Sequence, residues 1–236
     1  MADEDEQRRA QREARILGAA NSLITHYGYD KTTMDDIAGE AGVSKGAIYL
    51  HFKSKEALFE ALILRESERV MEDMFERIEA DPEGGTLFQL YTHALLAAIS
   101  NPLIRALFTR DRRGLGDFQR RIVGTETMQQ GMIFGRDFIL HLQDAGLVRR
   151  DLSAETITYL LAYMRMGFFM SENVLPPEHT PSVDVIMPAM ATLLSTGLTP
   201  GGESDSEAGK AIVRGYVEQM RAVLKAYRAQ AAEKQK

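Results

Sequence analysis

The chain has 236 residues, no Cys and no Trp, and 28 basic against 34 acidic side chains, which gives a formal net charge of −6. Without Cys it holds no disulfide, no Cys-ligated zinc and no thiol nucleophile. The polar, acidic start argues against a signal peptide, and no apolar run approaches the roughly 20 residues of a membrane span, so we expect a cytoplasmic protein.

Helical periodicity dominates the first part of the chain. Residues 1–7 are mostly charged and polar, and we predict a disordered tail there. Apolar positions from 8 to 27 recur at helical spacing, and Gly28 stands where a helix C-terminus is expected. Two short helices are predicted next, at about 34–41 and 44–52. Because no sustained period-two alternation occurs, the sequence favours an all-α fold.

Further helices are expected along the rest of the chain, separated by Gly and Pro clusters. A polar linker is expected at 199–209, and the amphipathic helix after it can pack on its own subunit or on a partner. The helices predicted beyond residue 54 span about 55–79, 87–100, 103–118, 118–145, 153–173, 183–198 and 206–236.

Residues 34–52 have the pattern of a helix–turn–helix. This motif needs a small residue where its helices cross, a Gly in the turn and an apolar residue that holds the second helix down. Ala38, Gly42 and Ile48 are residues of these types at separations of four and six positions. The second helix is too short to be stable alone, so one side must pack against its neighbours while the other stays exposed.

The exposed side of that second helix suits a nucleic-acid groove. Gly46 and Ala47 allow a close backbone approach near a helix N-terminus, where phosphates bind readily. Tyr49 and His51 can donate hydrogen bonds to phosphate oxygens, and Lys45 adds positive charge.

Local charge agrees with this interpretation, although the whole chain is acidic. Residues 7–55 carry eight basic and five acidic side chains, with Lys55 at the far end. Leu50 is unusual on an exposed helix. It can contact a thymine methyl group in the major groove, or it is an ordinary surface leucine.

Residues 14–62 resemble the DNA-binding domain of TetR-family transcriptional regulators. The resemblance rests on Thr32–Ala38, Ala41–Phe52 and Lys55–Leu58. It implies a homodimer, usually a repressor, in which an all-helical C-terminal domain binds a small ligand and DNA is then released. The DNA-contacting residues that it implies are Thr33, Ser44, Lys45, Gly46, Ala47, Tyr49, Leu50, His51 and Lys55.

Two further patterns suggest an enzyme or a metal site. Gly42-Val43-Ser44-Lys45-Gly46 matches the G-x-S-x-G elbow of α/β-hydrolases, but that elbow follows a buried strand, and the charged segment before it is helical in period. The five His residues never stand four positions apart, which disfavours a helical metal site. We expect no enzyme activity, no metal and no cofactor.

Met and aromatic residues concentrate between positions 128 and 190. They form either a plain core or an adaptable apolar pocket for a small effector. The arginines between Arg110 and Arg121 form either a solvated face or a rim that recognises an anion. The candidate ligand-binding residues are His93, Phe108, Met128, Met132, Phe138, His141, Tyr163 and Met166.

The helix at 153–173 is apolar on two nearly opposite sides, so both sides should be buried. With the helix at 183–198, this predicts an isologous dimer interface. One stripe contains Ile157, Leu160, Leu161, Met164 and Phe168, and the other contains Tyr159, Tyr163, Met166 and Met170.

These patterns predict a DNA-binding domain at 8–55, joined through the helix at 55–79 to a ligand-binding and dimerisation domain at 56–200. The linker and an extra helix follow at 201–236. The expected function is a ligand-responsive transcription regulator, a repressor that a small, largely apolar effector releases from a palindromic DNA operator. The alternative is a helical interaction or scaffold protein that binds no operator.

Overall fold

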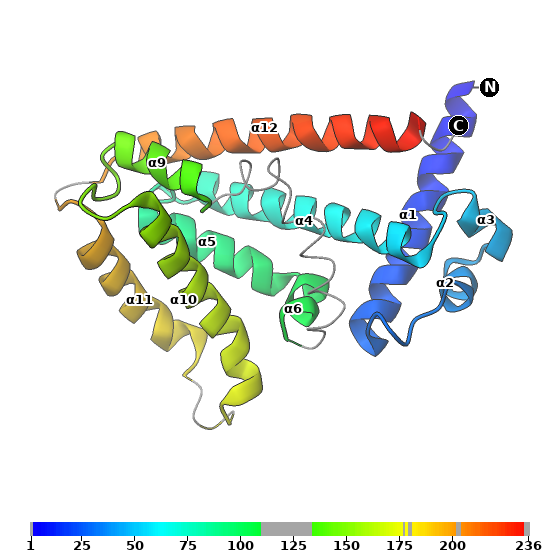
Figure 1. Cartoon of the computed structure of the whole chain (residues 1–236), viewed down its shortest axis with the longest axis horizontal. Coiled ribbons are helices and arrows are strands. Elements are labelled where there is room, and N and C mark those ends of the chain that lie inside the picture. Colours follow the sequence, from blue (N-terminus) through cyan, green and yellow to red (C-terminus); the bar gives the residue numbers. More distant parts are fainter. Residues whose placement is uncertain (1, 110–133, 177, 179–180, 202–203, 234–236) are drawn as a thin grey trace.

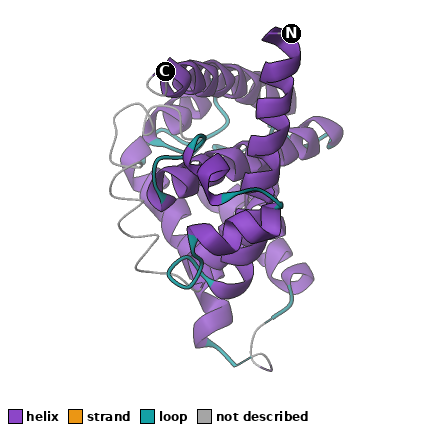
Figure 2. Cartoon of the chain, turned by 90° about the vertical axis from the view of Figure 1, so that its right-hand side faces the viewer, coloured by secondary structure: helices purple, strands orange, loops and turns teal. Residues whose placement is uncertain are grey.

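The computed structural model describes residues 2–109, 134–176, 178, 181–201 and 204–233. Within these ranges every regular element is a helix and no strand occurs, as Figure 1 and Figure 2 show. The expected all-α fold is therefore confirmed. Among the same residues, no helix combines the length and the apolarity that crossing a bilayer requires.

A long central helix, α4, joins two groups of helices (Figure 1). Helices α1 to α3 lie at one end of α4. At its other end lie α5, α9, α10 and α11, and α12 runs alongside α4. The helices are α1 (Ala2–Tyr27), α2 (Met34–Ala41), α3 (Lys45–Tyr49), α4 (Lys55–Ala80), α5 (Leu87–Ser100), α6 (Pro102–Thr109), α9 (Arg136–Asp144), α10 (Ala154–Val174), α11 (Val183–Leu198) and α12 (Ser206–Glu233).

Each group of helices has its own hydrophobic core, and α4 contributes to both. The first core joins α1, α2, α3 and the first half of α4, and it includes Leu62. Leu103 of α6 is also fully buried in this core, although α6 follows the second group's α5 in sequence. The second core contains Ile78 from the end of α4 together with α5, α9, α10, α11 and α12. The first core therefore extends beyond residue 55, where the sequence placed the end of the first domain.

Helix α1 begins at Ala2, so the prediction of a disordered tail at residues 1–7 is wrong for the described residues 2–7. Acidic residues favour this extension because a helix N-terminus carries partial positive charge. Glu4 and Asp5 stand in that first turn.

Short polar side chains begin the helices as the sequence predicted. Thr33, Ser44, Ser54 and Ser153 are N-caps, and the side chain of each accepts a hydrogen bond from the backbone N–H three residues later. These bonds satisfy donors that the first helical turn leaves free. Gly42 ends α2 at a φ of 63°, in the left-handed region that favours glycine.

Two helix predictions in the middle of the chain need correction. Helix α6 starts at Pro102, one residue earlier than predicted, because proline suits the first helical position. The helix expected over 118–145 is broken in its described part, because Phe134 has a φ of 63° and Gly135 is the N-cap of α9. Glycine inside a helix is unfavourable, which explains the break. The remainder of both predictions lies outside the described residues.

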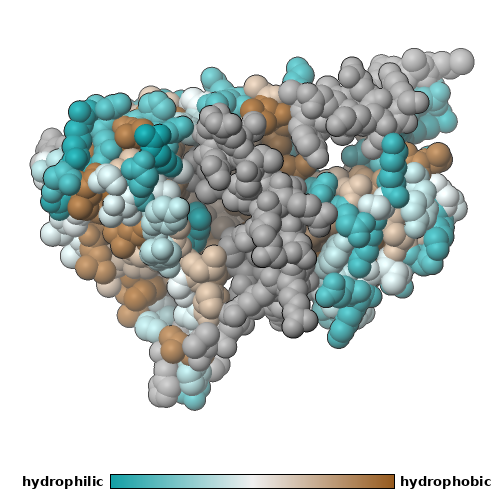
Figure 3. All heavy atoms as spheres, viewed as in Figure 1, coloured by the Kyte–Doolittle hydropathy of each residue, from teal (hydrophilic) through white to brown (hydrophobic). Residues whose placement is uncertain are grey.

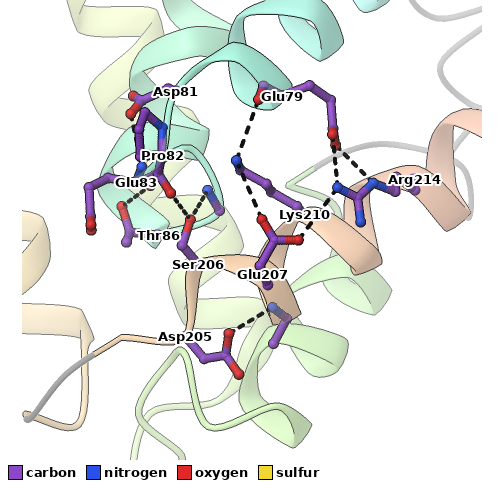
Figure 4. Close-up of polar contacts among 12 residues, drawn as sticks. Glu79, Asp81, Pro82, Glu83, Thr86, Asp205, Ser206, Glu207, Lys210 and Arg214 are labelled. Carbon is purple, nitrogen blue, oxygen red and sulfur yellow. Dashed lines mark hydrogen bonds and ion pairs between the residues drawn. The ribbon is translucent and has the colours of Figure 1, made fainter.

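Helix α12 starts at Ser206, where the helix predicted over 206–236 begins, so the linker expected at 199–209 ends before residue 206. Figure 4 shows why this turn is ordered: the Ser206 hydroxyl donates to the Pro82 carbonyl at 2.8 Å and accepts from the Gly85 N–H at 3.0 Å. Further along, Arg214 pairs with Glu79 at 2.8 Å. Helix α12 thus packs on α4 of its own subunit, which settles one of the two possibilities that the sequence left open.

Candidate nucleic-acid interface

The short helix α3 is fixed by burial of its inner side. Ile48 is fully buried and Phe52 nearly so, in the core that α1, α2 and α4 share. The turn before α3 is tight, because the Val43 N–H donates to the Ala38 carbonyl at 3.0 Å while Gly42 adopts its left-handed conformation. Packing therefore holds in place a five-residue helix that would not persist alone.

The outer side of α3 is exposed, as predicted. Lys45 and Gly46 face solvent, Tyr49 is 45% exposed and Leu50 is 73% exposed. Ala47 is half-buried, and its N–H donates to the Ser44 hydroxyl at 3.2 Å. A polar aromatic, a cation and a bare leucine thus project from one rigid surface.

The two lysines predicted to flank this surface both have protein partners. Lys45 Nζ lies 2.8 Å from Asp35 Oδ2, and this hydrogen bond, with the charge of Asp35, raises the pKa of Lys45. Lys55 Nζ lies 4.1 Å from the centre of the Tyr29 ring. Because the Lys45 pair is exposed, water screens it and a phosphate can replace the carboxylate at little cost. Thr33 is likewise exposed and bonded to Asp36.

His51 does not lie on the exposed side, which corrects the prediction that grouped it with Tyr49 and Leu50. Helix α3 ends at Tyr49, so a helical projection no longer applies two residues later. The ring is only 4% exposed and packs near Glu13 of α1, 3.8 Å from Nδ1 to Oε2. Burial lowers the pKa of His51. Glu13 opposes this shift, while Arg9 and Arg12 add to it.

We expect the neutral His51 ring to stabilise the first core. Because the folded-state pKa lies below the ordinary value of 6.5, this contribution is present above pH 6.5 and is lost as the pH falls through the folded-state pKa. Urea unfolding at pH 7.5 and 5.5 should show a larger loss of stability on acidification for the wild type than for His51→Gln. The exposed His26→Gln is the control. Parallel pH profiles for the wild type and His51→Gln would contradict this interpretation.

Arg9 and Arg12 are residues that the sequence analysis did not assign. Their charges act on His51, so the N-terminal part of α1 lies beside the end of α3. The sequence carries a signal for them, since Arg8, Arg9, Arg12 and Arg15 recur at helical spacing. Arg9 and Arg12 therefore add positive charge near His51, at the end of α3.

The predicted ligand-binding residues do not meet in one described cavity. Phe138 is fully buried in the second core, His93 Nε2 lies 2.8 Å from Asp81 Oδ2, and His141 Nδ1 lies 3.0 Å from the Tyr216 hydroxyl. None of the eight lines the pocket of about 270 Å³ between the end of α1 and α6. Met128, Met132 and the side chain of Phe108 lie outside what the structure describes.

Helix α10 has the two apolar sides that the sequence predicted. Ile157, Leu161 and Phe169 are buried against the second core. Tyr163 is 70% exposed, and Met166 is also exposed, so both candidate pocket residues lie on the outer side instead. Leu160, assigned to the inner stripe, is exposed as well, because it falls at the edge of that stripe. Exposed apolar residues continue onto α11 with Val185 and Leu193.

The hydrolase alternative fails on geometry. The segment before Ser44 is helix α2 and a tight turn rather than a strand, and the Ser44 hydroxyl caps α3. Among the described residues, no group of three or more His, Asp or Glu side chains is arranged to hold a metal ion.

Known proteins match the part of the chain that carries α1 to α4. Residues 16–62 fit the family model described as bacterial regulatory proteins, tetR family. The HTH-type transcriptional repressor Rv1474c of Mycobacterium tuberculosis is 43% identical over 61 residues, which cover 26% of this chain and 33% of that protein. The A-factor receptor protein of Streptomyces griseus is 36% identical over 75 residues, covering 32% of this chain and 24% of that protein. The chain thus matches a third or less of the length of these relatives.

The likeness in fold reaches further than the likeness in sequence. The fatty acid degradation regulator FadR from Bacillus halodurans superimposes with a TM-score of 0.59 over 77% of this chain and 93% of that chain, at 16% identity. Residues 16–62 therefore match the model of the tetR family of bacterial regulatory proteins, and the arrangement of helices over most of the chain is similar to that of FadR.

Proposed function

We propose that the chain is a DNA-binding transcription regulator, a repressor whose recognition helix is α3. The observation that carries this proposal is the exposed side of α3, with Lys45, Tyr49 and Leu50 held by a buried Ile48. Such a helix inserts into the major groove, where its N-terminal residues reach phosphates and base edges. The residues that we propose for these contacts are Thr33, Ser44, Lys45, Gly46, Ala47, Tyr49, Leu50 and Lys55.

The proposed assembly is a homodimer through the outer sides of α10 and α11. Tyr159, Tyr163 and Met166 of α10 and Val185 and Leu193 of α11 are exposed apolar residues. In Figure 3 hydrophobic residues, in brown, gather at the lower left, where Figure 1 places α11. A two-fold axis through this surface places two copies of α3 on successive half-sites, so the operator is a palindrome.

Effector control requires a connection between the two cores, and α6 supplies one. Leu103 of α6 is buried in the first core, while α6 also contacts α10. We propose that residues 8–55 bind DNA and that residues 56–200 bind a small, largely apolar effector and dimerise. An effector that prefers one position of α6 would then change the spacing of the two α3 helices and release the operator.

The test is an electrophoretic mobility shift on the DNA upstream of the protein's own gene. We expect specific binding at about 0.1 M salt that needs both half-sites of a palindrome. Lys55→Gln should weaken binding to all sequences and reduce the salt slope by about one unit, because one phosphate contact is lost. Lys225→Gln, an exposed position on α12, is the matched control.

Leu50→Ala separates base recognition from backbone contact in the same assay. A contact with a thymine methyl group predicts a changed sequence preference, whereas equal weakening at every site would argue for an ordinary surface leucine. If no palindrome-dependent binding occurs at all, the alternative of a helical interaction or scaffold protein is favoured.

A further inference from the structure

Helix α10 directs one arginine toward the interior of the second group of helices. Arg165 is partly buried, and it lies on the same side of α10 as Leu161 and Phe169, both almost completely buried. Residues four apart on a helix share one side, so the buried neighbours fix the direction in which the Arg165 side chain leaves the helix.

Arg165 has no carboxylate partner among the described residues. Its electrostatic neighbour is Tyr91 of α5, and burial raises the pKa of Tyr91 to about 12. The Tyr91 phenol is therefore neutral at pH 7 and cannot balance a positive charge. Its hydroxyl already donates to the Leu161 carbonyl at 3.3 Å. Burial lowers the pKa of Arg165, but a guanidinium stays protonated in proteins.

Other arginines around the second core are paired with carboxylates, so Arg165 is an exception within this part of the fold. The pairs are Arg136 with Glu155, Arg149 with Asp151, Arg150 with Asp144, Arg214 with Glu79 and Arg221 with Glu72.

Two hydroxyls near these residues in the sequence also lack partners. Thr92 Oγ1, next to Tyr91, and Thr158 Oγ1, two helical turns before Arg165 on the same side of α10, are buried without a hydrogen bond. Buried polar groups are almost always satisfied by protein, water or ligand. A partly desolvated cation such as Arg165, for which the described residues offer no carboxylate, is also disfavoured, because removing a charge from water is costly unless it is paired.

We propose that the effector of this protein carries an anionic group, a carboxylate or a phosphate, which Arg165 binds between α5 and α10. The proposal rests on the proposed function, since it names the chemical class of the effector. A guanidinium binds either group through two parallel hydrogen bonds. Leu161, Phe169 and Phe134, whose ring centre lies 5.8 Å from that of Tyr91, are buried apolar residues of the same core, and we propose that they contact the apolar part of the molecule.

Calorimetric titration of the full-length protein tests this directly, with three probes that share one alkyl chain: dodecanoate, dodecyl phosphate and dodecanol. We expect at least one of the two anions to saturate a single site per subunit and to bind about 10- to 100-fold more tightly than the neutral alcohol. The better anion shows whether the natural effector is a carboxylate or a phosphate ester. Equal binding of the alcohol, or no saturable binding of either anion, would overturn the proposal.

Variants at Arg165 provide a second, independent test of the anion site. Arg165→Gln should remove the preference for the anion, Arg165→Lys should keep part of it, and Arg136→Gln, an exposed arginine on α9, should leave it intact. Without ligand, Arg165→Met should raise the melting temperature by about 2–4 °C, because it removes a partly desolvated charge that no carboxylate of the described residues pairs. A fall of similar size would assign Arg165 a structural role.

The same samples of wild-type protein are assayed for operator binding. If the wild type binds its operator but neither anion, only the effector inference is overturned. Absence of operator binding overturns the proposed function.

Discussion

Replacing Glu66 with Ala is expected to lower the free energy of unfolding by about 3–5 kcal/mol. Glu66 lies on α4 and is only 2% exposed. Its Oε1 accepts hydrogen bonds from Arg65 Nε at 3.0 Å and Arg69 Nη1 at 2.9 Å, and its Oε2 accepts from Asn101 Nδ2 at 2.9 Å. Removing the carboxylate leaves the largely buried Arg65 without its counter-ion. Most of the lost stability comes from this unpaired positive charge.

The partners of Glu66 make this more than a local effect. Arg65 also donates to the Leu17 carbonyl of α1 at 3.0 Å. Asn101 Oδ1 accepts from the Ile104 N–H at 3.0 Å and so begins α6, whose Leu103 enters the first core. One carboxylate therefore joins α1, α4 and α6, at the place where the two cores meet.

Chemical denaturation of the purified protein measures this effect. Glu66→Gln, which keeps the shape and part of the hydrogen bonding, should cost less than Glu66→Ala. The matched control is Arg69→Gln, because that side chain is 60% exposed and its pair should contribute no more than about 1 kcal/mol. Similar losses in the free energy of unfolding for Glu66→Ala and Arg69→Gln would show that the buried hydrogen-bond network of Glu66 contributes no more than an exposed ion pair.

The second large effect is expected at Gly85. A Cβ atom there would lie 1.7 Å from the Ser206 carbonyl oxygen and 2.7 Å from the Lys210 nitrogen, both backbone atoms of α12. Gly85→Ala must therefore push the first turn of α12 away and break the hydrogen bonds of Ser206 with Pro82 and Gly85. We expect a loss of stability of about 3 kcal/mol, at the upper end for overpacking.

Gly215→Ala supplies the control on the same helix. Nothing lies within 4 Å of a Cβ at Gly215, so this change should raise stability by about 0.5–1 kcal/mol through helix propensity alone. Thermal unfolding compares the two variants, and hydrogen exchange of residues 206–214 locates the effect. If Gly85→Ala unfolds like the wild type and residues 206–214 exchange no faster, the contact between the turn before α5 and α12 is not tight.

The elements predicted well are those that short-range chemistry specifies. Thr33 and Ser44 begin helices because their side chains bond backbone groups three residues away, and Gly42 ends α2 because glycine tolerates a positive φ. The contacts that order the start of α12 could not be predicted in this way. Ser206 is ordered by a hydrogen bond to Pro82, 124 positions away, and no local pattern encodes that contact.

The same distinction applies to the candidate sites. The exposed side of α3 could be predicted from the helical period. The burial of His51 could not, because the helix ends before this residue. Tyr163 was expected both in a pocket and on a dimer surface, and the structure places it outside. The sequence analysis assigned no role to Arg165, because only the three-dimensional arrangement shows that the described residues around it include no carboxylate partner.

The pairing of α12 with α4 has a mechanical consequence. Arg214 and Arg221 stand seven residues apart, as do their partners Glu79 and Glu72, so two antiparallel helices are bonded at two points two turns apart. At 1.5 Å per residue, the 26 residues of α4 span about 39 Å. Two helices joined side by side bend far less than one. We therefore expect α4 and α12 to move as one rigid body, so that a displacement at one end of α4 also displaces its other end.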